Sequence, residues 1–151
     1  MLPNYHVNMI DIKRQAVLRE AIELFYFGYR AFTAHPDAIL QRRGLSRVHH
    51  RILYFVGRDP GLSVNTLLET LGVTKQALNA PLRRLVELKL VVVRVAPEDR
   101  RRRELRLTAE GERLEGQLTG TQMEQLATVL RVAGKPAEAG WRAVMGKMAG
   151  G

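Results

Sequence analysis

The 151-residue sequence contains no cysteine. This absence excludes a disulfide framework, a thiolate metal site and a cysteine nucleophile, and it fits a reducing compartment such as the cytoplasm. The sequence also lacks any apolar run of about 18 residues, the length that a membrane-spanning helix needs. Its first residues lack the basic start and apolar stretch of a signal peptide. We therefore expect a cytoplasmic protein with no membrane partner.

Signatures of catalysis are also missing. No nucleophile–base pair, pair of carboxylates or glycine-rich phosphate loop stands out in the sequence. Two adjacent histidines, His49 and His50, would diverge by about 100° on a helix, so they cannot chelate one metal ion together. The sequence thus predicts no enzyme activity, no cofactor and no metal site.

Positive charge, by contrast, is in excess, with a formal net charge of +9. Residues 42–106 contain 15 Lys/Arg and 6 Asp/Glu, whereas the rest of the chain contains 9 of each kind. The whole excess therefore lies in one central block. Such a block favours a polyanionic partner, most often nucleic acid. A basic surface without a partner is the alternative that charge alone leaves open.

The first part of the chain is predicted to be helical. Apolar residues recur with a period close to 3.6 over residues 12–34, which indicates a long amphipathic helix. We expect Pro36 to end this helix and a short helical piece to follow as far as Arg43. Ser46 is the expected N-cap of a further helix that ends near Val56. The aromatic cluster of the first helix is larger than a lone helix can bury.

A helix-turn-helix follows in the basic block. Helices are predicted over 64–71 and 75–88, with Ser63 and Thr74 as their caps and Gly72 as a left-handed residue between them. Leucines face inward on the second helix, and its outward side carries Lys75, Gln76, Asn79, Arg83 and Arg84. Pro81 lies beyond the first turn of this helix. We expect a kink there, or else a regular helix that starts only near Asn79.

A β-hairpin comes next. Residues 91–95 and 103–107 are short β-branched or alternating runs, and the turn cluster Pro97-Glu98-Asp99 separates them. The segment PEDRRRREL therefore places four consecutive arginines, 100–103, at the hairpin tip and the start of the return strand. Thr108 is the expected cap of another helix, which runs to about residue 133. Gly134-Lys135-Pro136 is expected to break the chain before a last helix over 139–148.

Several of these motifs occur together in one known family. Asp99-Arg100-Arg101 at the hairpin tip is followed by LRLTAEG at 105–111, and PGLSV at 60–64 and LGVT at 71–74 lead into the helix-turn-helix. In this order they resemble the D-x-R wing tip, the L-x-L-T-x-x-G motif and the preceding helices of the MarR family of bacterial winged-helix regulators. The resemblance is close over residues 45–111. The family usually has a glycine just before the wing, where this chain has Lys89.

The resemblance implies a mainly α fold with a small β-hairpin wing: a winged helix-turn-helix lobe flanked by N- and C-terminal dimerisation helices. The chain would be a single MarR-like domain, with an N-terminal helix and connector at 1–45, the lobe at 46–111 and C-terminal dimerisation helices at 112–151. Apolar side chains of the last helix, Trp141, Val144 and Met148, fit a homodimer. The alternative is that the terminal helices complete the core of a monomer.

The implied function is that of a transcriptional regulator, with repression as the expected mode, which binds a pseudo-palindromic double-stranded operator as a homodimer. Arg101 would enter the minor groove, and Asp99 would hold its guanidinium in a charge-assisted fork. Arg100, Arg102 and Arg103 would contact phosphates. The remaining expected DNA-binding residues are Ser63, Thr74, Lys75, Gln76, Asn79, Arg83 and Arg84. Gln and Asn suit adenine edges, and Arg suits guanine.

Many proteins that resemble this one carry a small aromatic or anionic effector between the dimer arms and the DNA lobe. The candidate residues for such a ligand here are Tyr26, Arg30, His49, Arg51 and Tyr54. Aromatic residues at helical spacing are also typical of a core, so this assignment has a plain structural alternative. Two other functions stay open: an architectural, non-specific DNA-binding winged helix without an effector, and a protein-interaction module that has lost DNA binding.

Overall fold

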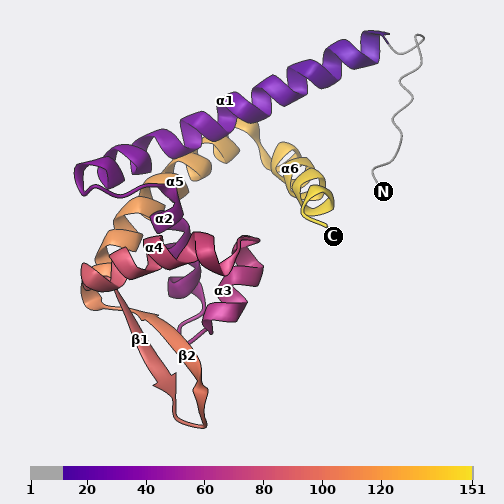
Figure 1. The fold of residues 1–151 in the computed structure, drawn as a ribbon. Helices are drawn as coiled ribbons and strands as arrows, with labels where there is room; N and C mark the ends of the chain where they lie inside the picture. Colours follow the sequence, from indigo (N-terminus) through magenta and orange to yellow (C-terminus); the bar gives the residue numbers. More distant parts are fainter. Residues whose placement is uncertain (1–11, 151) are drawn as a thin grey trace. The chain divides into compact units, whose positions relative to one another are not determined.

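The fold is described from a computed structural model, which describes residues 12–150 (Figure 1). The first residues, on which the signal-peptide prediction rests, lie outside this range. The elements are α1 (Ile12–Arg42), α2 (Arg47–Arg58), α3 (Val64–Leu71), α4 (Lys75–Glu87), β1 (Val91–Ala96), β2 (Asp99–Leu107), α5 (Ala109–Ala133) and α6 (Lys135–Met148). Within the described range, no helix has the length and apolar character that crossing a membrane requires. The chain divides into two compact units, residues up to 34 and residues from 35 onward.

The described part of the first unit is the N-terminal part of α1, from Ile12 to Ala34, and almost all of its side chains are exposed. They include nine large apolar residues with exposed fractions between 40% and 69%: Ile12, Val17, Leu18, Ile22, Leu24, Phe25, Tyr26, Phe27 and Tyr29. The rings of Tyr26 and Phe27 meet edge to face, with their centroids 5.3 Å apart. So much exposed apolar surface on one segment is typical of a protein interface.

The second unit contains a single leucine-rich core to which the end of α1, helices α2 to α5 and both strands contribute. Its fully buried side chains include Leu40, Ile52, Leu53, Val56, Leu67, Leu78, Leu85, Leu105, Leu114 and Leu118. Leu114 and Leu118 belong to α5, so the first half of this long helix packs into the winged-helix lobe rather than standing apart from it. Burial of this set is the main force that holds the lobe together.

Pro36 does not end the first helix, and this prediction was wrong. Helix α1 continues through the proline to Arg42. A proline inside a helix removes only the hydrogen bond from its own nitrogen and crowds the preceding turn. Here Pro36 is fully buried, and so is Leu40 one turn later. Burial of these two side chains in the core favours continuation of the helix over a break.

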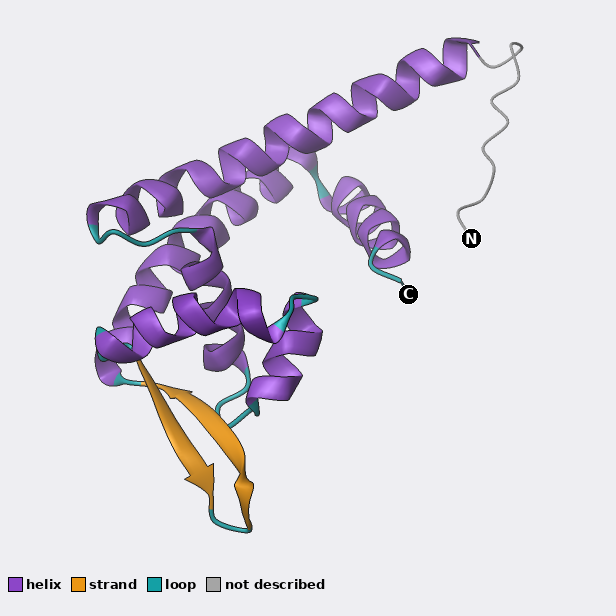
Figure 2. Ribbon diagram, viewed as in Figure 1, coloured by secondary structure: helices purple, strands orange, loops and turns teal. Residues whose placement is uncertain are grey.

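The helix-turn-helix is confirmed (Figure 2), and so are its two predicted caps. The Ser63 hydroxyl accepts a hydrogen bond from the Thr66 amide (3.1 Å), and the Thr74 hydroxyl accepts one from the Ala77 amide (3.1 Å). Gly72 adopts the expected left-handed conformation with φ of 64°. Helix α4 runs without interruption from Lys75 through Pro81, so the alternative in which its regular part starts near Asn79 does not apply.

The two strands form the predicted antiparallel hairpin, which Figure 2 shows as the only sheet among the described residues. Val91 pairs with Leu107, Val93 with Leu105 and Val95 with Arg103. A feature that the sequence did not suggest is a third backbone pairing at the base of the hairpin. The Gly61 amide donates to the Leu105 carbonyl (2.8 Å), and the Leu105 amide donates to the Leu62 carbonyl (2.9 Å). The segment before α3 thus anchors β2 to the helix-turn-helix.

A tight junction joins the wing to the helices on either side of it. The Thr108 hydroxyl caps α5 by accepting from the Gly111 amide (3.0 Å), and it donates to the Lys89 carbonyl (2.6 Å). The Thr108 amide donates to the Leu90 carbonyl (3.0 Å). A Cβ atom on Gly111 would overlap that same Leu90 carbonyl oxygen. The threonine and glycine of the LRLTAEG segment therefore have a structural role, since they fix the point where the wing leaves the lobe.

The last helix starts earlier than predicted. Helix α6 begins at Lys135, directly after Gly134, which has φ of 96°. Pro136 was expected to separate the helices, but it lies in the first turn of α6, where the amide that proline lacks would have no partner within the helix. The break between α5 and α6 is therefore confined to Gly134.

Candidate nucleic-acid interface

The outward side of α4 is polar and exposed. Leu78 and Leu85 are fully buried on its inner side. Lys75, Gln76, Asn79, Arg83 and Arg84 are all exposed, as the sequence predicted. Ser63 and Thr74 differ from this set because both hydroxyls are already engaged as helix caps. Any contact that these two residues make with a ligand would have to share a hydroxyl group that stabilises a helix.

The two arginines of α4 have different surroundings. The positive charge of Arg84 acts on His49 of α2, where it adds to the burial that lowers the pKa of that histidine. Arg84 is therefore close enough to α2 for its charge to act on that histidine. Arg83 is 100° further round the helix, on the side that carries Gln76. Of the two, Arg83 is the better placed to contact a ligand on the outward face.

The wing presents its arginines in an irregular part of β2. Val95 pairs with Arg103, but the next residue of β1, Ala96, pairs with Asp99. Arg100, Arg101 and Arg102 thus lie between two paired residues and have no partner residue on β1. All four arginines of the run are exposed. The loop that joins the strands consists of only Pro97 and Glu98.

The acidic residues of the tip are arranged differently from the prediction. The Asp99 carboxylate accepts a hydrogen bond from the backbone amide of Arg101 (Oδ1 to N, 2.9 Å). It forms no ion pair with the Arg101 guanidinium, or with any other arginine of the described chain. The predicted fork between these two side chains was therefore wrong. The other acid, Glu98, lies 4.0 Å from Arg102 (Oε1 to Nη1).

Comparison with known proteins places this geometry in a family. The MarR family pattern matches residues 43–102, from the end of α1 into β2. Over 131 residues the chain is 47% identical to the HTH-type transcriptional regulator PetP of Rhodobacter capsulatus. The matched stretch covers 87% of this chain and 79% of that protein. The chain belongs to the MarR family. It is a helix-turn-helix transcriptional regulator.

Solved structures of MarR-family proteins share the fold. The chain is similar to MepR of Staphylococcus aureus in a complex with DNA, with a TM-score of 0.69 and 22% identity over 84% of this chain and 94% of that one. It is also similar to NadR in complex with 4-hydroxyphenylacetate, with a TM-score of 0.70 and 23% identity over 83% and 89% of the two chains. The winged-helix fold predicted from the sequence is confirmed.

The five candidate effector residues lie on two helices. In the first unit, Arg30 stacks on the aromatic pair, with its guanidinium carbon 5.0 Å from the Phe27 ring centre and 5.9 Å from that of Tyr26. The others lie on α2. His49 is engaged as part of a capping box, in which its Nδ1 accepts from the Ser46 amide (3.0 Å). Arg51 is exposed, and Tyr54 is half-buried with its ring edge against Phe55.

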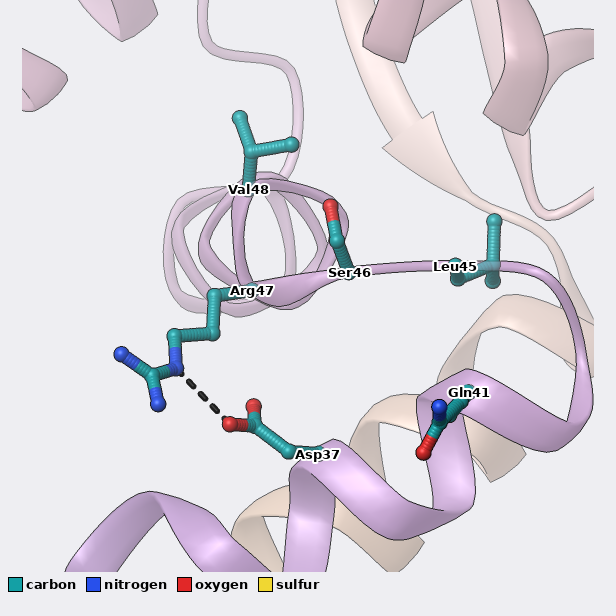
Figure 3. A pocket seen from close by; sticks show the side chains of 6 residues that line it. All are labelled: Asp37, Gln41, Leu45, Ser46, Arg47 and Val48. Carbon is teal, nitrogen blue, oxygen red and sulfur yellow. Dashed lines mark hydrogen bonds and ion pairs between the residues drawn. The ribbon is translucent and has the colours of Figure 1, made fainter. Parts of the chain in front are cut away.

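A surface depression of about 450 Å³ lies where the end of α1 meets the start of α2 (Figure 3). It is lined by Asp37, Gln41, Leu45, Ser46, Arg47 and Val48. The Arg47 side chain points at Asp37, and its Nε lies 2.8 Å from the carboxylate. None of the predicted effector residues lines this depression, and no motif in the sequence pointed to it.

The second histidine is buried inside the lobe. His50 Nε2 lies 3.2 Å from the Thr119 hydroxyl, so this pair connects α2 to α5. Burial lowers the pKa of His50, and the charge of Arg51 acts in the same direction, whereas Asp37 opposes it. Neither His49 nor His50 belongs to a metal cluster, because no group of three His, Asp or Glu side chains in residues 12–150 is arranged to hold an ion.

Proposed function

We propose that this MarR-family protein is a homodimeric, sequence-specific repressor that binds a pseudo-palindromic operator in double-stranded DNA. One observation carries most of the proposal. The exposed polar side of α4 and the arginine run of the wing belong to the same lobe, and residues 42–106 hold all of the net positive charge of the chain. A helix with a polar outward side and a basic hairpin beside it suit neighbouring grooves of one duplex.

Helix α4 is the proposed reader of base edges in the major groove. Gln76 and Arg83 share its outward side, and Asn79 lies at the margin. Amide side chains pair best with adenine, and arginine pairs best with guanine, at about 1–3 kcal/mol of discrimination for each bidentate contact. Lys75, at the first position of the helix, is suited to a phosphate.

The wing is the proposed minor-groove element. A narrow minor groove concentrates negative potential, so it attracts an exposed arginine without a base-specific contact. Arg101 is the residue of the run whose backbone is held by a side chain, which favours it as the inserted residue. Arg100, Arg102 and Arg103 are proposed to contact the flanking phosphates.

The homodimer is proposed from exposed apolar surface at both ends of the described chain. Helix α6 exposes Trp141, Val144 and Met148, and α1 exposes residues such as Ile22 and Leu24. A second copy of the chain would remove these side chains from water. Two-fold symmetry would then place the two α4 helices about 34–36 Å apart, one turn of DNA, which requires a pseudo-palindromic site. A dimer bound across a promoter would exclude RNA polymerase from it.

A small aromatic or anionic effector is proposed to release the protein from DNA. The complex of NadR with 4-hydroxyphenylacetate shows that a protein of this fold binds such a compound. Tyr26, Arg30, Arg51 and Tyr54 have the aromatic and cationic groups that an aromatic carboxylate needs. Binding of His49 to an effector would disrupt the capping box of α2. Titration of aromatic carboxylates into the protein–operator complex tests the proposal, and a complex that none of them dissociates would contradict it.

The decisive experiment is a gel-shift titration with duplex DNA from the region upstream of the protein's own gene. We expect a retarded complex that survives an excess of random duplex, because specific sites are typically bound about 10³-fold or more tighter than random DNA. Equal affinity for the two duplexes would instead support an architectural, non-specific DNA-binding protein. A reporter gene under the same promoter distinguishes repression from activation.

Two variants separate base reading from wing binding. Arg83→Ala should reduce the preference for the specific duplex, by about 10-fold or more, and should weaken random binding much less. Arg101→Ala should weaken both and reduce the slope of log affinity against log salt by about one. If both variants kept the wild-type affinity for both duplexes, the assignment of α4 and the wing as the DNA interface would be wrong.

A further inference from the structure

The wing tip contains a built-in irregularity that exposes backbone as well as side chains. Between the paired residues Asp99 and Arg103, three arginines have no partner residue on β1. An amide in such a bulge has lost the cross-strand acceptor that a regular ladder would supply. Without a substitute acceptor, no hydrogen bond within the hairpin would fix the backbone orientation of Arg101, the middle residue of the three.

The substitute acceptor is Asp99. Its Oδ1 lies 2.9 Å from the Arg101 amide, the two-residue spacing by which an aspartate closes a local turn with its side chain. This contact uses one oxygen as an acceptor and does not require a negative charge. The carboxylate makes no ion pair within the described chain, whereas the neighbouring Glu98 lies beside Arg102. Asp99 therefore acts at the tip through this hydrogen bond and not through its charge.

We propose that Asp99 is a positioning residue that aims Arg101 through the backbone, and that its negative charge opposes DNA binding. This inference rests on the proposed function, in which the wing lies among phosphates. A carboxylate at that place repels the phosphates and reduces the attraction that the four arginines provide. A neutral side chain with the same acceptor should therefore bind DNA better than aspartate does.

The test is a set of affinity measurements on the full chain by fluorescence anisotropy, with a labelled duplex from the upstream region. Asp99→Asn keeps an oxygen in place of Oδ1 and removes the charge, and it should bind about twofold tighter than wild type. Asp99→Ala removes both and should bind about three- to tenfold more weakly, the cost of one lost hydrogen bond. Glu98→Gln is the matched control, because it removes one negative charge from the same tip without touching the Arg101 amide. It should resemble Asp99→Asn.

A second measurement reports the positioning without DNA. In amide exchange followed by NMR, the Arg101 amide should be protected in wild type and Asp99→Asn, and it should exchange faster in Asp99→Ala. If Asp99→Asn binds DNA as weakly as Asp99→Ala does, the inference is overturned, because that result would mean that the negative charge is required. Equal exchange in all three proteins would overturn it as well.

Failure of the proposed function is distinguishable from failure of this inference. If Arg101→Ala leaves DNA affinity unchanged, the wing is not a DNA-binding element and the part of the proposed function that assigns DNA binding to the wing fails. If Arg101→Ala weakens binding and Asp99→Asn also weakens it, the wing binds DNA but Asp99 acts by its charge, and only the positioning inference fails.

Discussion

Lys89 illustrates how a single residue can retain an unfavourable conformation. It has φ of 59°, and it is the only non-glycine residue with positive φ in the described chain. This is the position where the MarR family usually has glycine, which adopts such angles without a steric penalty. Its backbone is held in place by its neighbours, because the Lys89 carbonyl accepts from Thr108 and the Leu90 carbonyl accepts from the Thr108 amide. The junction thus imposes on a lysine a conformation that suits glycine.

Replacement of this lysine by glycine should therefore stabilise the protein. We expect Lys89→Gly to raise the free energy of unfolding by about 0.5–1 kcal/mol, the relief of left-handed strain less the entropy that glycine gains in the unfolded chain. Lys89→Ala is the control. It retains the Cβ that causes the strain, so it should not gain stability. Chemical denaturation of the three proteins decides the matter, and a glycine variant less stable than the alanine variant would show that the strain is not significant.

At the scale of the elements, the contact between α2 and α5 depends on a buried histidine. His50 and the Thr119 hydroxyl meet between these helices, and both side chains are buried. The pKa of His50 is lowered by burial, so the neutral ring is the form that the folded lobe accommodates. Glu115, which hydrogen-bonds the same threonine, has its pKa raised by burial. Acidification therefore reduces the stability of the folded lobe through His50 and increases it through Glu115.

Acidification should weaken this contact through His50. Because the folded pKa lies below the ordinary value of 6.5, the unfolded chain binds the proton more readily, and the contribution of His50 to stability is lost as pH falls through and below that value. The variant His50→Gln keeps a polar group for Thr119 and does not titrate. Its free energy of unfolding should therefore fall less between pH 7 and pH 5 than that of wild type. Urea unfolding of both proteins across this range measures the difference. His49 and Glu115 titrate in both proteins, so they do not produce a difference between the two. An equal decline in stability in wild type and His50→Gln would contradict the assignment to His50.

At the scale of the whole molecule, the exposed apolar surface is the dominant feature. Within α6, the side chains of Trp141, Val144 and Met148 follow one another at helical spacing on one side, and 44–67% of each is exposed. An isolated chain would keep this surface in contact with water, as it would the apolar side chains of α1. A monomer with these features is expected to associate.

A charge on that side of α6 should disrupt the proposed homodimer. We expect Val144→Glu to shift the protein from twice the mass of one chain toward the mass of one chain, as measured by light scattering during gel filtration. Burial of an unpaired carboxylate in an interface costs several kcal/mol. Ala143→Glu is the matched control, because it adds the same charge about 130° around the same helix from the centre of that side, and it should remain dimeric. If wild type itself has the mass of one chain, the dimer proposal is wrong.

Local structure could be predicted from the sequence wherever a short segment determines its own conformation. Ser63, Thr74 and Thr108 are caps as predicted, and Gly72 has the predicted left-handed backbone, because each depends on a few neighbouring atoms. The arginine run was placed correctly on the return strand of a hairpin. The exposed polar set of α4 followed from the inward spacing of its leucines. The family itself could be recognised from motifs of this local kind.

Tertiary structure decided the remaining features, because they depend on groups that are distant in the chain or on packing that outweighs a local preference. Pro36 lies inside a helix since the core buries it, and Pro136 begins a helix rather than separating two. Lys89 is left-handed since Thr108, 19 residues later, holds its carbonyl. The partner of Asp99 is the backbone of Arg101 rather than its guanidinium, because the register of the hairpin leaves that amide in a bulge. The sequence by itself determined which residues the wing carries, and only the folded hairpin determined what holds them in position.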